Sequence, residues 1–150
     1  DETPSAEVYM PTGSWRLLKR LCQLCPEHQF TLADFSWLPP QPDGAINAPV
    51  VQTQRHGQTL DLEGDYLRAP GVCDILFPTH FEHLAIMVQA ASARIKGATG
   101  GSVSAASFST ADFMREWHDM ESTATRSGFN PMLEDFTNTR FLCTSSARRP

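Results

Sequence analysis

The stretch from residue 72 to residue 95, VCDILFPTHFEHLAIMVQAASARI, decides the fold class. Its first six residues are mostly apolar and predict a central, buried strand. Pro78 ends this strand, and Thr79 with Glu82 forms the spacing of a capping box, which starts a helix. Apolar residues then recur at the period of one helix face, at Phe81, Leu84, Val88, Ala91 and Ile95. A strand followed by an amphipathic helix predicts an α/β fold.

Segments before this stretch add a helix and further strands. Residues 1–12 form a polar leading segment, and Ser14 predicts the N-cap of a helix that Pro26 ends. Residues 29–34 alternate polar and apolar side chains and predict a strand. Residues 48–53 predict a second strand at a sheet edge, because Pro49 has no N–H to donate. A hairpin follows, with its turn at residues 55–57 and its return strand at 58–62.

The segments after the stretch predict a connector, a helix and a last strand. Residues 97–107 are small and polar, which favours a flexible connector over a phosphate-binding loop because no Lys precedes a Ser or Thr there. Ser109 and Asp112 predict the cap of a helix that Ser127-Gly128 ends. The apolar face of that helix is expected at Phe113, Trp117, Met120 and Ala124. Residues 139–144 predict the final strand.

Composition excludes several classes of protein. The chain has 150 residues, of which 41% are hydrophobic, so it amounts to one domain or part of a larger one. Twelve basic and 17 acidic residues give a formal charge of −5, which argues against nucleic-acid binding. No run approaches the roughly 18 apolar residues of a membrane span. The first residues, DETP, contain no signal-peptide core and are typical of a segment inside a longer protein.

The four cysteines leave two interpretations open. Cys22 and Cys25, followed by His28, have spacing that a zinc site could use, but no second Cys-x-x-Cys completes it. The pair falls in a predicted helix, which favours buried cysteines on one helix face and no metal. Cys73 and Cys143 lie in apolar, strand-like runs and are expected to act as small hydrophobic residues. Together they predict a reducing compartment.

Two groups of polar residues are candidates for chemistry. Asp34 ends a predicted strand, where an acid can bind a ribose, a guanidinium or an amine if the sheet is parallel. It can equally cap the next turn through the amides of Phe35 or Ser36. His80, Glu82 and His83 begin the long helix, and either metal or acid–base chemistry or simple helix capping accounts for them.

Three ordered motifs carry a resemblance to a known family. They are PTG (11–13) with LADFSWLP (32–39) and NAPVVQT (47–53), CDILFPTHFE (73–82), and DFMREW (112–117) with Glu121, TRSG (125–128) and NPML (130–133). In these motifs the chain resembles the C-terminal half of the MidA-like mitochondrial methyltransferases. These are protein arginine methyltransferases linked to assembly of respiratory complex I, and the resemblance is to their fungal-type branch. It covers residues 9–144 apart from the 97–107 connector.

The resemblance implies a fold, a cofactor and partners. Residues 1–150 would form the C-terminal portion of a Rossmann-like methyltransferase fold, a mixed sheet with flanking helices. S-adenosylmethionine would be bound mainly by a glycine-rich loop in the N-terminal half, which has no counterpart here, so this segment alone would be inactive. Asp34, His80 and Glu82 are candidates for lining the substrate site, although the family usually has Asp where this chain has His80. No cofactor-binding or metal residue is expected in the chain.

The implied partners are a protein substrate, such as a subunit of respiratory complex I, and the missing N-terminal half of the same domain. The implied localisation is mitochondrial. The alternative is a methyltransferase-like scaffold without catalysis, which would bind a partner protein during assembly. A small zinc module at Cys22, Cys25 and His28 is the third possibility.

Overall fold

The computed structural model describes residues 7–27, 29–39, 46–62, 71–96 and 103–146. The chain divides into two compact units. Unit 1 comprises residues 1–10 and 37–78, and unit 2 comprises residues 11–36 and 79–150. No helix among the described residues is both long enough and apolar enough to cross a membrane.

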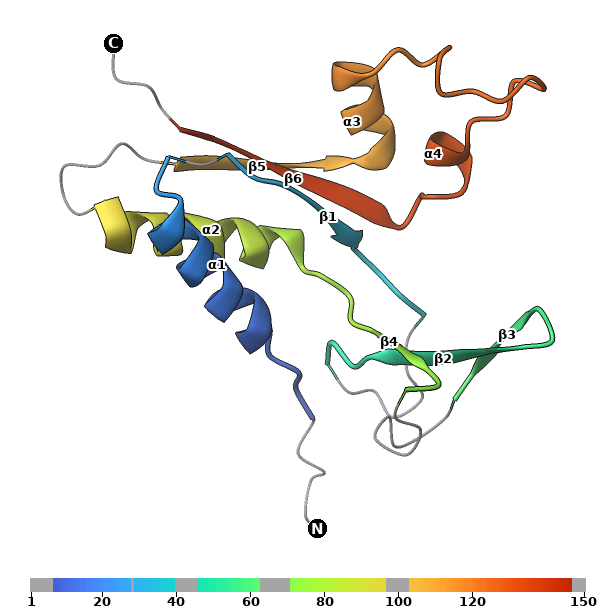
Figure 1. Ribbon diagram of the computed structural model, residues 1–150, viewed down its shortest axis with the longest axis horizontal. Helices are drawn as coiled ribbons and strands as arrows, with labels where there is room; N and C mark the ends of the chain where they lie inside the picture. Colours follow the sequence, from blue (N-terminus) through green and yellow to red (C-terminus); the bar gives the residue numbers. More distant parts are fainter. Residues whose placement is uncertain (1–6, 28, 40–45, 63–70, 97–102, 147–150) are drawn as a thin grey trace. The chain divides into compact units, whose positions relative to one another are not determined.

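Unit 2 is a three-stranded sheet with helices. Its strands are β1 (Thr31–Phe35), β5 (Val103–Ser109) and β6 (Thr139–Ser146). Its helices are α1 (Thr12–Leu24), α2 (Phe81–Lys96), α3 (Thr110–Trp117) and α4 (Pro131–Glu134). The strand order is β1-β6-β5, and β6 is antiparallel to both neighbours (Figure 1). Strands β1 and β5 therefore run parallel to each other.

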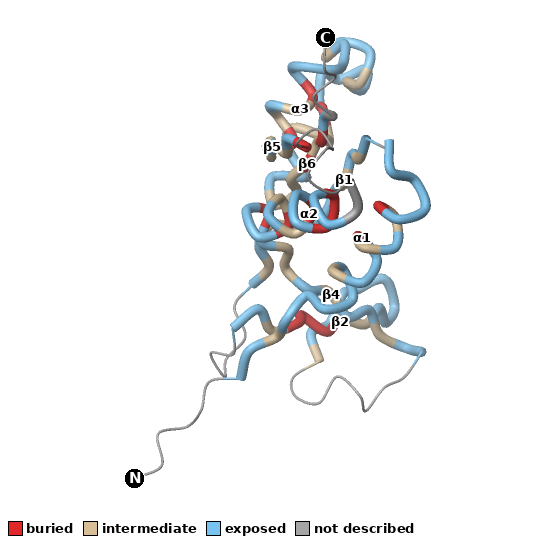
Figure 2. Tube along the Cα trace, turned by 90° about the vertical axis from the view of Figure 1, so that its left-hand side faces the viewer, coloured by how far each residue is buried: buried red, intermediate tan, exposed pale blue. Residues whose placement is uncertain are grey.

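The core of unit 2 lies between the sheet and the two long helices. In Figure 1, α1 and α2 cover one face of the sheet and α3 lies on the other. Figure 2 shows buried positions along α2 and in the sheet next to it. Four of the five residues predicted for the apolar face of α2 are buried, which confirms the helical period predicted from the sequence. The side chain of the fifth, Ile95, lies outside the described part of the chain. The core residues are Leu18, Cys22, Phe81, Leu84, Val88, Ala91, Val103 and Leu142.

Unit 1 contains a smaller antiparallel sheet of order β3-β2-β4. Its strands are β2 (Val50–Arg55), β3 (Gln58–Asp61) and β4 (Asp74–Leu76). The predicted hairpin is confirmed, since β2 pairs with β3 across a turn in which His56 and Gly57 have φ angles of 52° and 77°. Positive φ at both central residues is the requirement of a type I′ turn, whose twist matches that of the strands.

The positions predicted for two strands of this sheet are wrong. Strand β4 has three residues, lies at the edge, and leaves Val72 66% and Phe77 44% exposed, so residues 72–77 do not form a central strand. Strand β2 is central and not at the edge. Pro49 precedes the first residue of β2 and is therefore not required to donate to the ladder.

The predicted connector is also wrong in part. Residues 103–107 belong to β5, and residues 97–102 lie outside the described part of the chain. The Ser- and Ala-rich composition of this segment does not indicate a strand. Strand β5 is stabilised by backbone hydrogen bonds to β6, with which it pairs along seven residue pairs. The final strand, predicted at 139–144, is confirmed, and it runs on to Ser146.

Two helix boundaries differ from the predictions. Helix α1 begins at Thr12 with Pro11 at its N-cap, so Ser14 lies inside the helix. Helix α3 begins after Ser109 as predicted but ends at Trp117 and not at residue 127. The chain then turns, and Gly128, with φ of 85°, belongs to a turn that Thr125 closes by hydrogen bonding. Asn130 and Pro131 form the capped start of the short helix α4.

Candidate functional site

Asp34 lies near the end of β1 and binds the segment just before α2. Its Oδ2 accepts a hydrogen bond from the Thr79 hydroxyl at 2.6 Å, and its Oδ1 accepts one from the Phe35 amide at 2.8 Å. The amide of Thr79 donates in turn to the carbonyl oxygen of Phe35 at 2.8 Å. Two of these bonds join the end of β1 to the start of α2, although the two segments are more than 40 residues apart in the sequence.

This geometry tests one of the two interpretations of Asp34, the cap of the following turn. The predicted cap through the Phe35 amide is present, whereas the amide of Ser36 donates to the carbonyl of Asn138 at 2.7 Å instead. Asp34 does not lie at the carboxyl edge of a purely parallel sheet, because β1 pairs with an antiparallel neighbour. The residue nevertheless remains exposed at this end of the strand, so a ligand can reach it.

The two histidines at the start of α2 stack on one another. Their ring centroids are 4.0 Å apart and the planes are inclined by 19°. The Nδ1 atom of His80 accepts from the amide of His83 at 3.4 Å, which is the contact that an N-cap side chain makes. The capping-box prediction is therefore wrong by one residue: His80 occupies the cap position, while the hydroxyl of Thr79 binds Asp34.

Glu82 lies in the first turn of α2 and is exposed. A carboxylate there interacts favourably with the amide groups at the helix start. The structure thus places all three candidates, Asp34, His80 and Glu82, around the junction of β1 and α2. All three are exposed, and the hydrogen bonds of Asp34 and His80 stabilise the fold.

The four cysteines lie in different surroundings among the described residues. Cys22 is buried in the core beside the hydroxyl of Ser92, as expected for a helix-face residue, but Cys25 is exposed at the C-cap of α1. His28 lies outside the described residues. Within the described ranges, no group of three His, Cys, Asp or Glu side chains could hold a metal ion. Cys143 lies in β6 as expected, whereas Cys73 precedes β4.

An aromatic cluster on the other face of the sheet was missed by the sequence interpretation. The ring of Phe113 stacks on Phe141, with centroids 3.9 Å apart and planes inclined by 5°. Trp117 contacts the edge of Phe108 at 4.9 Å and the tilted ring of Phe113 at 4.7 Å. The four-residue spacing of Phe113 and Trp117 was visible in the sequence. Their partners were not, because Phe108 and Phe141 meet through the register of β5 and β6.

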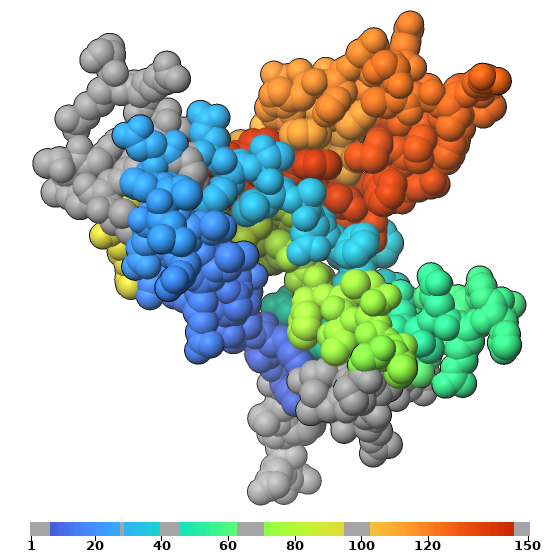
Figure 3. Space-filling model, viewed as in Figure 1, coloured from blue at the N-terminus to red at the C-terminus, as the bar shows by residue number. Residues whose placement is uncertain are grey.

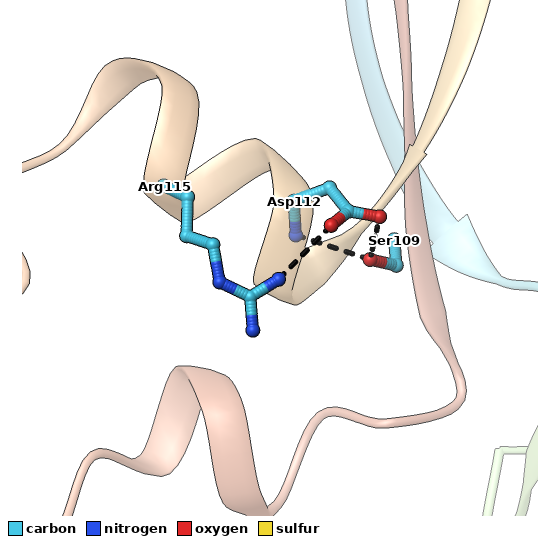
Figure 4. A network of polar contacts seen from close by, with 3 residues as sticks. All are labelled: Ser109, Asp112 and Arg115. Atoms are coloured by element: carbon cyan, nitrogen blue, oxygen red, sulfur yellow. Dashed lines mark hydrogen bonds and ion pairs between the residues drawn. The ribbon is translucent and has the colours of Figure 1, made fainter.

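The start of α3 is fixed by a small polar network, drawn in Figure 4. The Ser109 hydroxyl accepts from the Asp112 amide at 3.0 Å and donates to the Asp112 carboxylate at 2.7 Å. Arg115 pairs with the same carboxylate at 3.0 Å. This confirms the predicted Ser109–Asp112 cap and orients the helix that carries Phe113 and Trp117.

Comparison with known proteins identifies a family. Residues 1–99, about two thirds of the chain, match the family model described as "Putative S-adenosyl-L-methionine-dependent methyltransferase". The match includes Asp34, His80 and Glu82. Neither the curated proteins nor the solved structures contained a match to this chain. The mixed α/β architecture of antiparallel sheets and helices is consistent with a methyltransferase-like fold. The chain therefore belongs to this family of S-adenosyl-L-methionine-dependent methyltransferases.

Proposed function

We propose that these residues form the C-terminal portion of a Rossmann-like domain that transfers methyl groups from S-adenosylmethionine to arginine side chains of proteins. The family match carries the proposal. The topology of unit 2 supports it, since β1 and β5 are parallel and α2, which lies between them in the sequence, covers one face of their sheet. Parallel strands joined through a helix are the building unit of α/β domains.

The open edge of β1 supports the view that another part of the domain completes the sheet. Thr144 donates to the carbonyl of Phe30 and Ser36 donates to that of Asn138, so even-numbered residues of β1 bind β6. The backbone groups of Thr31 and Ala33 then point away from β6, and no strand among the described residues pairs with them. An exposed strand edge of this kind is suited to accept a further strand.

The described residues do not fit a cofactor site of the expected kind. The strand-to-helix connections after β4 and β5 contain no glycine, since residues 77–80 are FPTH and β5 passes directly into α3. A loop that holds a nucleotide-like cofactor needs glycines in such a turn, so that the backbone can approach the ligand. We therefore assign S-adenosylmethionine binding to a part of the domain outside these residues.

The surface around Asp34, His80 and Glu82 is the proposed substrate side. A guanidinium nitrogen is a poor nucleophile unless carboxylates hold the group and take up its charge. Asp34 and Glu82 supply two exposed carboxylates at the junction of β1 and α2. The proposed partners are a protein substrate, such as a respiratory complex I subunit, and the proposed location is the mitochondrion. Both follow from the motif resemblance.

A scaffold without catalysis is the second candidate. Asp34 and His80, two of the three candidate residues, form hydrogen bonds that fix β1 and α2, and this structural role would persist without methyl transfer. A partner-binding role in complex assembly would then be the function of the domain.

Calorimetric titration of S-adenosylmethionine tests the proposal. We expect no measurable heat of binding with the 150-residue chain, and binding with the protein expressed from the complete reading frame that encodes it. Micromolar affinity of the 150 residues alone for S-adenosylmethionine would overturn the proposal that another part of the domain binds the cofactor. With the longer protein, transfer of a radiolabelled methyl group to an arginine peptide supports the enzyme, whereas cofactor binding without any transfer favours the scaffold.

A further inference from the structure

The aromatic cluster at α3 leaves a large ring at the surface. Phe108, Phe113 and Phe141 are half-buried, but Trp117 is 47% exposed while it contacts two of them. Figure 3 shows α3 and the segment after it at the surface of unit 2. An indole ring held by neighbouring rings loses little conformational freedom when it binds a ligand, so it is prepared for contact.

The segment that carries this ring is rich in exposed acidic residues. Residues 110–121 contain four carboxylates and one arginine, a net charge of −3 in a chain whose total is −5. All four carboxylates, Asp112, Glu116, Asp119 and Glu121, are exposed. Asp112 is paired with Arg115, whereas Glu116, next to Trp117, makes no ion pair with any described residue. We refer to the four aromatic and four acidic residues as the α3 patch.

We propose that the α3 patch docks an arginine-containing, basic segment of a partner protein. The planar guanidinium of arginine stacks on an aromatic ring and forms two parallel hydrogen bonds with a carboxylate, and it is less strongly hydrated than the ammonium of lysine. In this patch Trp117 supplies an exposed ring, and Glu116 supplies an exposed carboxylate that no described cation occupies. The negative charge of the patch repels phosphate groups and excludes nucleic acid as the occupant.

The patch shares no residue with the surface defined by Asp34, His80 and Glu82. The family match ends at residue 99, before β5 and α3 begin, so the matched region does not include these residues. The proposal concerns docking alone and holds whether or not the domain transfers methyl groups.

NMR titration of the whole 150-residue chain with a synthetic arginine–glycine repeat peptide tests the proposal. We expect the indole N–H signal of Trp117 and the amide signals of residues 110–121 to shift, with a dissociation constant that rises with salt. The Trp117→Leu substitution keeps an apolar side chain in the cluster and is expected to weaken binding about fivefold. Glu116→Gln leaves the packing intact and is expected to weaken it about threefold at low salt.

Matched controls separate this site from general attraction to an acidic protein. Trp37→Leu removes an exposed indole in unit 1, and Glu27→Gln removes an exposed carboxylate outside the patch. Both should leave the affinity unchanged. A lysine–glycine peptide should bind more weakly than the arginine peptide. The proposal would be overturned if the control and patch variants lost the same affinity for the arginine peptide. It would also be overturned if only the NMR signals of other residues shifted, or if the two peptides bound with equal affinity.

Discussion

Substitutions of Asp34 and Thr79 should show that a single hydrogen bond between the two side chains joins β1 to the start of α2 and contributes to the free energy of unfolding. A net hydrogen bond contributes about 1 kcal/mol to the free energy of unfolding. Thr79→Val removes the 2.6 Å bond to Asp34 and is expected to cost about 1 kcal/mol. Asp34→Ala removes that bond and the 2.8 Å bond from the Phe35 amide, and is expected to cost about 2 kcal/mol.

The double variant distinguishes one shared bond from two separate effects. Because Thr79→Val has no further bond to remove once Asp34 is absent, the pair should cost about 2 kcal/mol, a coupling energy of about 1 kcal/mol. Urea unfolding followed by the helical circular dichroism signal measures this, since all four described helices belong to unit 2. Thr79→Ser, which keeps the hydroxyl, is the control. A loss of about 3 kcal/mol in the double variant, the sum of the two single losses, would refute a hydrogen bond shared by the two side chains.

Three further substitutions test the core, a helix cap and a turn by the same measurement. Leu142→Ala in β6, where the side chain is fully buried, should lower the free energy of unfolding by about 3 kcal/mol, against less than about 1.5 for Leu142→Met. Ser109→Ala should cost about 1 kcal/mol because the Asp112 amide loses its acceptor, and Ser109→Thr, which keeps the hydroxyl, should retain most of the stability of the cap. Gly57→Ala should destabilise the hairpin by about 1 kcal/mol, because alanine disfavours positive φ. His56→Asn should not, because asparagine favours positive φ. An unchanged free energy of unfolding in Gly57→Ala would contradict the assigned turn.

The amphipathic helix was the most predictable element. Phe81, Leu84, Val88 and Ala91 repeat at the helical period, and the structure buries all four. Local information suffices here, because one helix face meets the core and its period is set by backbone geometry. The hairpin was predictable for a similar reason, since the turn chemistry at His56-Gly57 is local.

Strand positions within the sheets were not predictable in the same way. Residues 72–77 are apolar enough for a central strand, yet β4 lies at an edge. The small residues of β5 suggested a connector, yet they pair with β6. In both cases the outcome depends on which strand supplies the hydrogen-bond partner from a distant part of the chain, and composition does not encode that choice.

The sequence predicted where the candidate residues lie in the fold but not what they contact. Asp34 and Glu82 emerged from their positions at element boundaries, and the structure places both at the junction of β1 and α2. The shift of the cap from Thr79 to His80 could not be predicted, because Thr79 has an alternative partner in Asp34 that is distant in sequence. The aromatic cluster at Trp117 was hidden for the same reason, since half of its rings come from strands.

The structural bonds of Asp34 do not prevent it from binding a guanidinium. Each oxygen of an ionised carboxylate has two lone-pair positions. Oδ1 uses one for the Phe35 amide and Oδ2 uses one for the Thr79 hydroxyl, which leaves one acceptor position on each oxygen. Two acceptors on one exposed carboxylate are what the paired N–H groups of arginine require. Because the existing bonds also fix the orientation of the carboxylate, the structural role of Asp34 is compatible with the proposed binding of an arginine substrate.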